Sequence, residues 1–264
     1  MAGERVAGER VAGGQVKVRV GVALGGYGDA ARYTAAVDRL EAMGVDSLWV
    51  QEMVFGPLVE PFIGMAHALA RTSRLKVGTG VAVLPGRHPV LVAKQLASLA
   101  ALSPGRVLPA FGLQTARADE RPMFPVPAGR RGAVFDESLE LLRLLLRQES
   151  VSFTGQYFTV EAASVGPLPR KPIDIWTGGS APGALRRTGR LADGWLGSFL
   201  TPGEAGAARS HPGGGRGRWP PDRGGPLRDQ PGRGHRGDSR VAGGRGPAPA
   251  PGRGSGRADR LRLG

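Results

Sequence analysis

Two glycines interrupt an apolar segment at a place where a flat ring could lie against the backbone. Gly78 and Gly80 stand inside the run from Leu75 to Leu84, which otherwise has the pattern of a buried strand. Glycine in a strand sacrifices packing and backbone entropy, so another group is expected to approach the backbone there. A cofactor ring would be such a group. A β-bulge or a crowded barrel interior is the alternative interpretation.

A second pair of glycines could bind an anion. Gly178 and Gly179 precede Ser180 and a predicted helix, which leaves bare backbone N–H groups beside a helix N-terminus. Such an arrangement favours a phosphate group. The other interpretation is an ordinary helix start in which Ser180 is the capping residue.

Glu52 is a carboxylate that follows a short apolar strand, 47–51. It could accept hydrogen bonds from a ring or a substrate, or it could pair with an arginine on the rim of the fold. His88 precedes Pro89 at a predicted helix start, which is typical of a capping residue, and His67 lies in the middle of a predicted helix. No His, Asp or Glu spacing fits a metal site, and no local motif suggests a Ser/His/Asp triad.

Apolar periodicity predicts strands and helices in alternation along the chain. The predicted strands cover residues 16–24, 47–51, 76–84, 107–111, 173–176 and 195–200. The first predicted helix begins after Asp29 and ends at Gly44. The other four cover residues 61–71, 90–102, 135–146 and 182–191. Residues 151–160 depart from the alternation, with the pattern of a hairpin that turns at Gly155 and Gln156. The alternation predicts an α/β fold, with a parallel sheet and helices outside it.

Six strands with five helices between them predict a (β/α)8 barrel that lacks its last two repeats. A doubly wound open sheet is the alternative, but no Gly-x-Gly-x-x-Gly turn follows the first strand. In a barrel the ligand site lies at the C-terminal ends of the strands. That edge would hold Glu52, Gly80 with Val81, Gly112 and the segment 176–180.

Four blocks of sequence recur here in an order that resembles the luciferase-like flavin and deazaflavin oxidoreductases. They are the run 75–84, Arg87-His88-Pro89, the segment 175–180 and the segment 191–195. The resemblance covers about residues 16–208 and implies an incomplete TIM barrel of that type. Residues 107–112 resemble the branch that uses coenzyme F420, which implies hydride transfer between F420 and a small organic substrate. An FMN-dependent luciferase-like monooxygenase is the second interpretation, and an inactive truncated homologue is the third.

The resemblance also implies which residues touch the cofactor. They are Gly80, Val81, Gly112, Thr177, Gly178, Gly179 and Ser180. Deazaflavin-using members carry a non-prolyl cis peptide behind the ring, at the position of Gly80-Val81, and a carboxylate near the cofactor makes Glu52 the candidate catalytic residue. Met53 stands where the sugar-phosphate dehydrogenases of this family have a histidine, so their chemistry is not implied. Parts of the outer helical layer can join two subunits in this family, which would give a homodimer.

The formal net charge of +14 is concentrated near the C-terminus, because residues 203–264 hold 13 arginines and 5 acidic residues. Rich in Arg, Gly and Pro and without apolar periodicity, residues 209–264 are predicted to be a disordered tail. A frameshift in a GC-rich gene is its favoured origin. The alternative is an RNA-binding Arg/Gly segment, but aromatic residues are not interleaved, so a nucleic-acid partner is disfavoured. We therefore expect a mobile leader, 1–14, and a truncated barrel domain, 15–208, before this tail.

The chain has no cysteine, which excludes disulfides and thiolate metal sites and favours the cytoplasm. No apolar run reaches the length of about 18 residues that a membrane span needs. There is also no secretory leader. We therefore expect a cytoplasmic enzyme that acts on a small molecule, binds no metal and does not associate with membranes.

Overall fold

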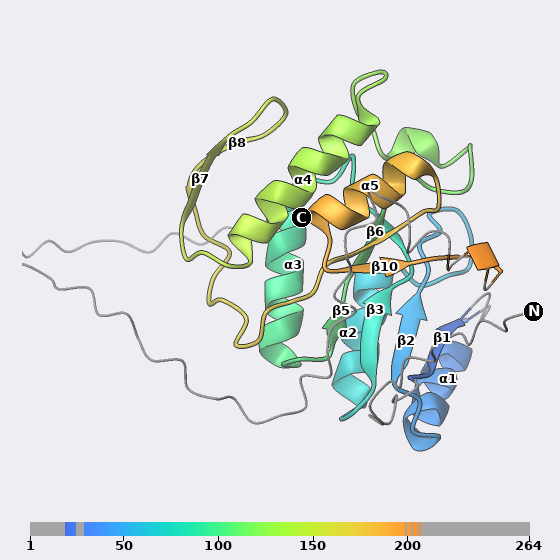
Figure 1. Ribbon diagram of the computed structural model, residues 1–264. Helices are drawn as coiled ribbons and strands as arrows, with labels where there is room; N and C mark the ends of the chain where they lie inside the picture. The colour runs from blue at the N-terminus through green and yellow to red at the C-terminus, as the bar shows by residue number, and fades with distance from the viewer. Residues whose placement is uncertain (1–18, 25–28, 199, 202, 205, 207–264) are drawn as a thin grey trace, which may run out of the picture. The chain divides into compact units, whose positions relative to one another are not determined.

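A computed structural model of the chain describes residues 19–24, 29–198, 200, 201, 203, 204 and 206. The predicted leader, 1–14, and tail, 209–264, lie outside these residues. The strands are β1 (Gly21–Leu24), β2 (Ser47–Val50), β3 (Lys76–Thr79), β4 (Ala82–Val83), β5 (Val107–Leu108), β6 (Ala110–Gly112), β7 (Val151–Thr154), β8 (Thr159–Ala163), β9 (Trp176–Gly178) and β10 (Gly194–Leu196). Figure 1 shows β7 and β8 apart from the other strands, on the outer side of α3 (Pro89–Leu102) and α4 (Arg131–Leu145).

Two of the predicted strands are each divided in the middle. β3 and β4 are the two halves of the predicted strand 76–84, separated by Gly80 and Val81. β5 and β6 are separated by Pro109, which has no N–H to donate to a ladder. The Thr79 hydroxyl bridges this interruption, because Oγ1 accepts from Ala110 N at 2.8 Å and donates to Ala110 O at 2.6 Å.

The parallel strands follow one another in chain order. β1 pairs with β2, β2 with β3 and β3 with β5, while β4 pairs with β6, β6 with β9 and β9 with β10. In the described part of the chain, β1 and β10 are the two ends of this series. A doubly wound sheet would reverse its strand order at one point, and no such reversal occurs here. The arrangement is therefore that of a TIM barrel which the described residues do not close.

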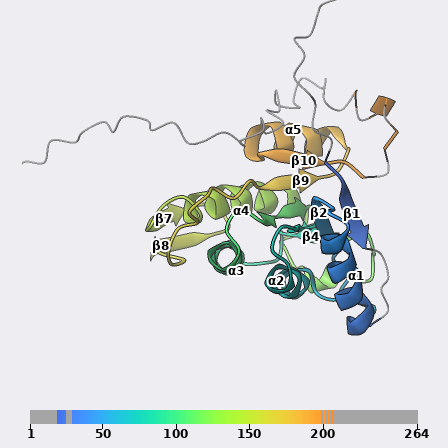
Figure 2. The ribbon, with the colours of Figure 1, turned by 90° about the horizontal axis from the view of Figure 1, so that it is seen from below.

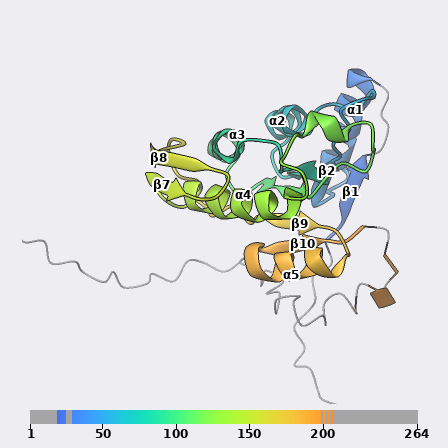
Figure 3. The same ribbon diagram turned by 90° about the horizontal axis from the view of Figure 1, so that it is seen from above.

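The helices pack around this sheet in chain order. They are α1 (Ala30–Ala42), α2 (Pro61–Arg71), α3 (Pro89–Leu102), α4 (Arg131–Leu145) and α5 (Pro182–Leu191), with a short 3-10 turn, η1 (Arg121–Met123), before α4. Each helix contacts the next along the chain, and Figures 2 and 3 show α1, α2 and α3 in a row. None of the helices in the described part of the chain is long and apolar enough to span a membrane.

Local signals set the starts of two of these helices. The Asp29 carboxylate accepts from Arg32 N at 2.7 Å and caps α1, as predicted. His88 caps α3 through Nδ1, which accepts from Val90 N at 3.3 Å, so the predicted capping function is confirmed. Pro89 then occupies the first helical position, where its missing N–H costs nothing.

Two tryptophans fill space that glycines leave free inside the barrel. The rings of Trp49 and Trp176, from β2 and β9, lie 5.7 Å apart between centroids. A Cβ on Gly21 would come within 2.7 Å of Trp49 Nε1, and a Cβ on Gly194 would come within 2.6 Å of the Trp176 ring. Side chains at these glycines would therefore displace the tryptophans that pack the interior.

The predicted hairpin is confirmed as β7 and β8, an antiparallel pair that Figure 1 shows beside α4. Glu137 of α4 holds its turn, since the carboxylate accepts from the backbone N–H groups of Gln156, Tyr157 and Phe158 at 2.8 to 2.9 Å. The fifth predicted strand, 173–176, begins later than expected. Ile173 and Ile175 are buried, but the pairing starts where Trp176 N donates to Pro109 O at 2.9 Å.

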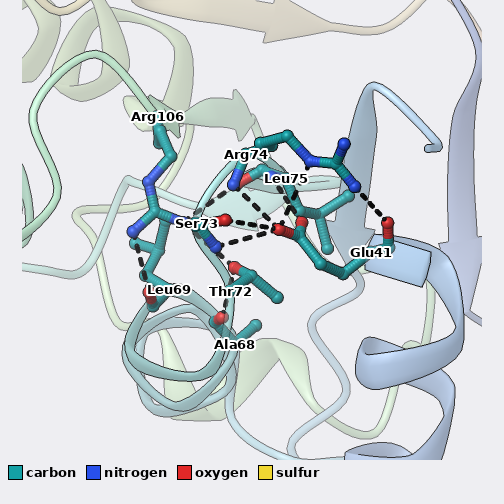
Figure 4. A network of polar contacts seen from close by, with 8 residues as sticks. All are labelled: Glu41, Ala68, Leu69, Thr72, Ser73, Arg74, Leu75 and Arg106. Carbon is teal, nitrogen blue, oxygen red and sulfur yellow. Dashed lines mark hydrogen bonds and ion pairs between the residues drawn. The ribbon is translucent and has the colours of Figure 1, made fainter.

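A carboxylate also anchors the chain at the opposite end of the strands, where α1 and α2 lead into β2 and β3. Glu41 accepts from the backbone N–H groups of Ser73, Arg74 and Leu75 at 2.8 to 3.0 Å and from the Ser73 hydroxyl at 2.9 Å (Figure 4). Burial alone would raise the pKa of the Glu41 carboxyl, but these hydrogen bonds outweigh it and lower the pKa to about 2. The ionised form is therefore stabilised by folding.

Replacing Glu41 with Gln tests this anchor. Because the folded-state pKa lies below the ordinary value, the stabilisation is fully present above about pH 5 and is lost as the pH falls toward 2. We expect Glu41→Gln to lower the free energy of unfolding by on the order of 2 kcal/mol at pH 7 and by much less at pH 3. Urea unfolding at both pH values measures this difference.

The control is Asp38→Asn on the same helix as Glu41, which removes an exposed ion pair with Arg71 of α2. Such a solvent-exposed pair contributes little to stability, so we expect a small loss that changes little between the two pH values. An equal loss in both variants, or a Glu41→Gln effect that is independent of pH, would contradict the anchor.

Candidate active site

Three predicted site residues from three different strand ends meet around one side chain. Val81 lies between β3 and β4, Gly112 ends β6 and Gly178 ends β9. A Cβ on Gly112 would lie 2.7 Å from Val81 Cγ2, and a Cβ on Gly178 would lie 3.0 Å from Val81 Cγ1. The isopropyl group of Val81 therefore occupies the space that both glycines leave open. The Gly80-Val81 peptide bond is cis, as the resemblance implies.

Gly78 and Gly80, the two glycines in the predicted strand 76–84, lie against neighbouring protein atoms. A Cβ on Gly78 would lie 2.0 Å from the Leu108 carbonyl oxygen, and a Cβ on Gly80 would lie 2.9 Å from Trp49 Cβ. The crowded barrel interior, given above as the alternative, is what the structure shows on these sides of the two residues. A cofactor contact by Gly80 stays a prediction, and it would have to come from another side of its backbone.

The predicted anion loop lies directly after β9. Gly179 has a φ of +102°, which residues with a side chain rarely adopt. Trp195 Nε1 donates to Gly179 O at 2.8 Å and holds the loop against β10. The alternative interpretation, in which Ser180 caps the helix, is wrong, because the N-cap of α5 is Ala181 and makes no side-chain hydrogen bond. The exposed Ser180 is thus one residue too early in the chain to cap α5.

Thr177 fastens β9 to the following helix. Its Oγ1 lies 2.7 Å from Oγ1 of Thr188 in α5, and the Thr188 hydroxyl donates to Ala184 O at 3.0 Å. Thr177 is 1% exposed, so its side chain has no open path to a ligand. A cofactor contact by Thr177 stays a prediction and would come from its backbone.

Glu52 is paired with an arginine on the rim, which is one of the two functions that the sequence left open. Its carboxylate accepts from Val83 N at 2.6 Å and from Arg87 Nη1 at 2.9 Å, and Arg87 Nη2 donates to the other oxygen. The Glu52 side chain is only 3% exposed. The Arg87 guanidinium also lies over the rings of Phe62 and Phe124, at 5.8 and 5.0 Å from their centroids. The catalytic function of Glu52 stays a prediction.

A second buried carboxylate at the strand ends was not identified from the sequence. Glu120 is fully buried and accepts from Phe55 N at 3.0 Å and from the Thr115 hydroxyl at 2.7 Å. Burial would raise the pKa of its carboxyl, but hydrogen bonds from the Phe55 N–H, the Thr115 hydroxyl and the Val54 N–H lower it on balance. Glu120 lies in an arginine-rich loop, where a single acidic residue looks like a solvated charge, so no local signal marks it.

The structure thus divides the predicted site into two groups. Val81, Gly112 and Gly178 lie together, with Gly179 and Ser180 next in the chain. Glu52 lies after β2, where Val83 N donates to it from the end of β4. His67 lies apart on α2, where Nε2 is 3.0 Å from the Thr34 hydroxyl, and His88 is used as a cap.

The strand order, the cis peptide and the glycine loop occur in a chain whose sequence matches a known family. The family described as luciferase-like monooxygenase matches residues 13–211. The chain belongs to this family. It is 39% identical over 141 residues to an uncharacterized protein of Mycobacterium tuberculosis H37Rv. The aligned segment covers 53% of this chain and 48% of that protein.

Other relatives of this luciferase-like chain are named for their cofactor. It is 29% identical over 164 residues to an F420-dependent glucose-6-phosphate dehydrogenase from Kineococcus radiotolerans, covering 59% of this chain and 49% of that enzyme. The chain spans about half the length of the curated relatives it matches.

Solved structures show the same fold. The coenzyme F420-dependent tetrahydromethanopterin reductase of Methanopyrus kandleri matches with a TM-score of 0.64 and 20% identity, over 74% of this chain and 60% of that one. The FMN-bound oxygenating constituent of 3,6-diketocamphane monooxygenase from Pseudomonas putida matches with a TM-score of 0.56 and 20% identity, over 67% and 56%. The predicted luciferase-like barrel fold is thereby confirmed.

The packing of Val81 against the two glycines can be tested by a double-mutant cycle. Gly112→Ala places a methyl group on the Val81 side chain, and we expect a loss of about 1–3 kcal/mol in the free energy of unfolding. In a Val81→Ala background the colliding methyl groups are absent, so the same substitution should cost less than about 1 kcal/mol. Urea unfolding of the four proteins measures the coupling. Additive effects of the two substitutions would show that Val81 does not fill this space.

Proposed function

We propose that this chain binds coenzyme F420 and transfers a hydride between it and a small organic substrate. The observation that carries the proposal is the cluster of Val81, Gly112 and Gly178 beside an open glycine loop at a helix N-terminus. Relatives named as F420-dependent enzymes support this choice of cofactor. The proposal also rests on the membership of the chain in the luciferase-like family.

The residues present fit a ligand with a flat ring and an anionic tether. α5 begins at Pro182, and its N-cap, Ala181, makes no side-chain hydrogen bond. Pro182 has no N–H and Ala184 N donates to Ala181 O at 2.8 Å, so the positive end of the helix and the Gly183 N–H are what α5 offers to an anion. Gly179 and Ser180 are exposed just before it. They would hold the phosphate group, and the backbone around Gly80 and Val81 would lie behind the ring.

The bound deazaflavin would supply the hydride chemistry, while the protein supplies binding and orientation. Val81 packs against two strand ends, so the backbone at this position is held by β6 and β9 together. The Glu52–Arg87 pair fixes the chain after β2 to the end of β4. These contacts would keep the floor of the site in one geometry while a ligand binds above it.

FMN is the alternative cofactor, and the FMN-bound structural neighbour supports it. The two cofactors are separated by adding each to the purified chain and following its absorption and fluorescence. We expect F420 to bind at least about tenfold more tightly than FMN, a difference of about 1.4 kcal/mol. Tight retention of FMN without a response to F420 would overturn the proposal, and binding of neither would favour an inactive homologue.

The glycine loop provides a sharper form of this experiment. Gly179→Ala strains a backbone with a φ of +102° and brings the new methyl group to 3.1 Å from Ala184 Cβ, so we expect F420 affinity to fall about tenfold or more. Gly44→Ala is the matched control, because Gly44 has a φ of +71° and lies in open space after α1. Equal F420 affinity in the two variants would mean that the loop does not hold the cofactor.

A further inference from the structure

We propose that Glu120 is a positioning residue, which holds the loop between β2 and α2 so that Phe55 contacts the apolar part of an uncharged substrate. The proposal rests on the function proposed above, because it assigns a substrate class to the same site. It concerns two loops that both follow strand C-termini: residues 51–60 after β2 and residues 113–130 after β6.

The carboxylate of Glu120 links these two loops. Oε1 accepts from Phe55 N at 3.0 Å, and Oε2 accepts from the Thr115 hydroxyl at 2.7 Å. The side chain is fully buried although it is charged, and Arg117 Nε lies 3.5 Å from Oε1. A buried carboxylate is costly unless hydrogen bonds satisfy it, so loosening the 51–60 loop would take the Phe55 N–H donor away from Glu120 Oε1. The loop is therefore held in place through its backbone at Phe55.

Apolar side chains are exposed around this link. Val54 is 41% exposed, Phe55 is 42% exposed and Met123, three residues after Glu120, is 49% exposed. The backbone of Phe55 is fixed while much of its ring remains in solvent, which leaves apolar surface free for a ligand. Exposed apolar residues that gather beside a site are typical of surfaces that bind ligands.

Arg117, the cation that faces Glu120, is paired within the second loop. Arg117 donates to Asp119 from Nη2 at 2.6 Å and from Nε at 3.2 Å, so this cation is neutralised within the loop. Glu120 on its other side is itself buried. Arg121, the residue after Glu120, is exposed to solvent, so the apolar surface that suits an aliphatic or aromatic group is that of Phe55 and Met123 themselves.

The test uses a series of straight-chain 2-alkanols, with glucose 6-phosphate as the charged comparison. Dissociation constants are measured by calorimetry on the F420-loaded chain without turnover. A methylene that leaves water for an apolar wall contributes about 0.8 kcal/mol, so we expect the affinity to rise up to about fourfold per added carbon. Phe55→Ser and Glu120→Gln should both flatten this dependence, whereas Phe55→Leu should retain it.

Glu41→Gln is the matched control for Glu120→Gln. Both carboxylates accept backbone N–H groups from a loop, but Glu41 lies at the opposite end of the strands, so its loss should leave the dependence on chain length unchanged. If Glu120→Gln does not fold, Phe55→Ser decides, because it changes an exposed side chain.

The outcomes separate this inference from the function on which it rests. Failure of F420 to bind would refute the proposed function. If F420 binds, two results would overturn the inference. One is an alkanol affinity that does not depend on the number of carbons, and the other is a dependence on the number of carbons that Phe55→Ser leaves unchanged. Tighter binding of glucose 6-phosphate than of every alkanol would also overturn it.

Discussion

The candidate site depends on a packing contact between one side chain and two glycines that lack one. Because Gly112 and Gly178 have no Cβ, the isopropyl group of Val81 reaches into the space at the ends of β6 and β9. Three strand ends are thereby held together at one point, and the cis peptide before Val81 lies at the same place. The predicted anion loop follows Gly178 directly, so the position of this loop depends on the same contact. A cofactor bound here would rest on backbone that several strands fix together.

Buried or partly buried carboxylates hold the loops around this barrel. Glu41 binds the N–H groups before β3, Glu52 binds Val83 N, Glu120 binds Phe55 N and Glu137 binds the turn of the hairpin. In each case an ionised side chain accepts from backbone donors that would otherwise lack partners, and charge-assisted bonds of this kind are stronger than neutral ones. The loops after β2 and β6 thus gain fixed positions without forming α-helices or strands.

Much of the fold could be predicted from the sequence, because local sequence patterns determine where many of its helices and turns begin and end. The bounds of α2 and α5, the Asp29 cap, the His88 cap and the hairpin turn all follow from periodicity, capping residues and glycine placement. Contacts between distant residues could not be predicted in this way. Nothing near Val81 indicates that its side chain fills the space beside Gly112 and Gly178, and Glu120 is separated from Phe55 by 65 residues. The start of β9 was also displaced, since the break at Pro109 decides where pairing with that strand begins.

The most direct test of this account is methyl NMR spectroscopy of the chain with labelled valine, recorded before and after F420 is added. Because the Val81 side chain lies beside both glycines, we expect nuclear Overhauser effects from its two methyl groups to the Hα protons of both Gly112 and Gly178 in the free chain. We also expect the Val81 signals to shift when F420 binds. Absence of contacts to either glycine, or Val81 signals that stay unchanged at saturating F420, would contradict the claim that these strand ends form the floor of the cofactor site.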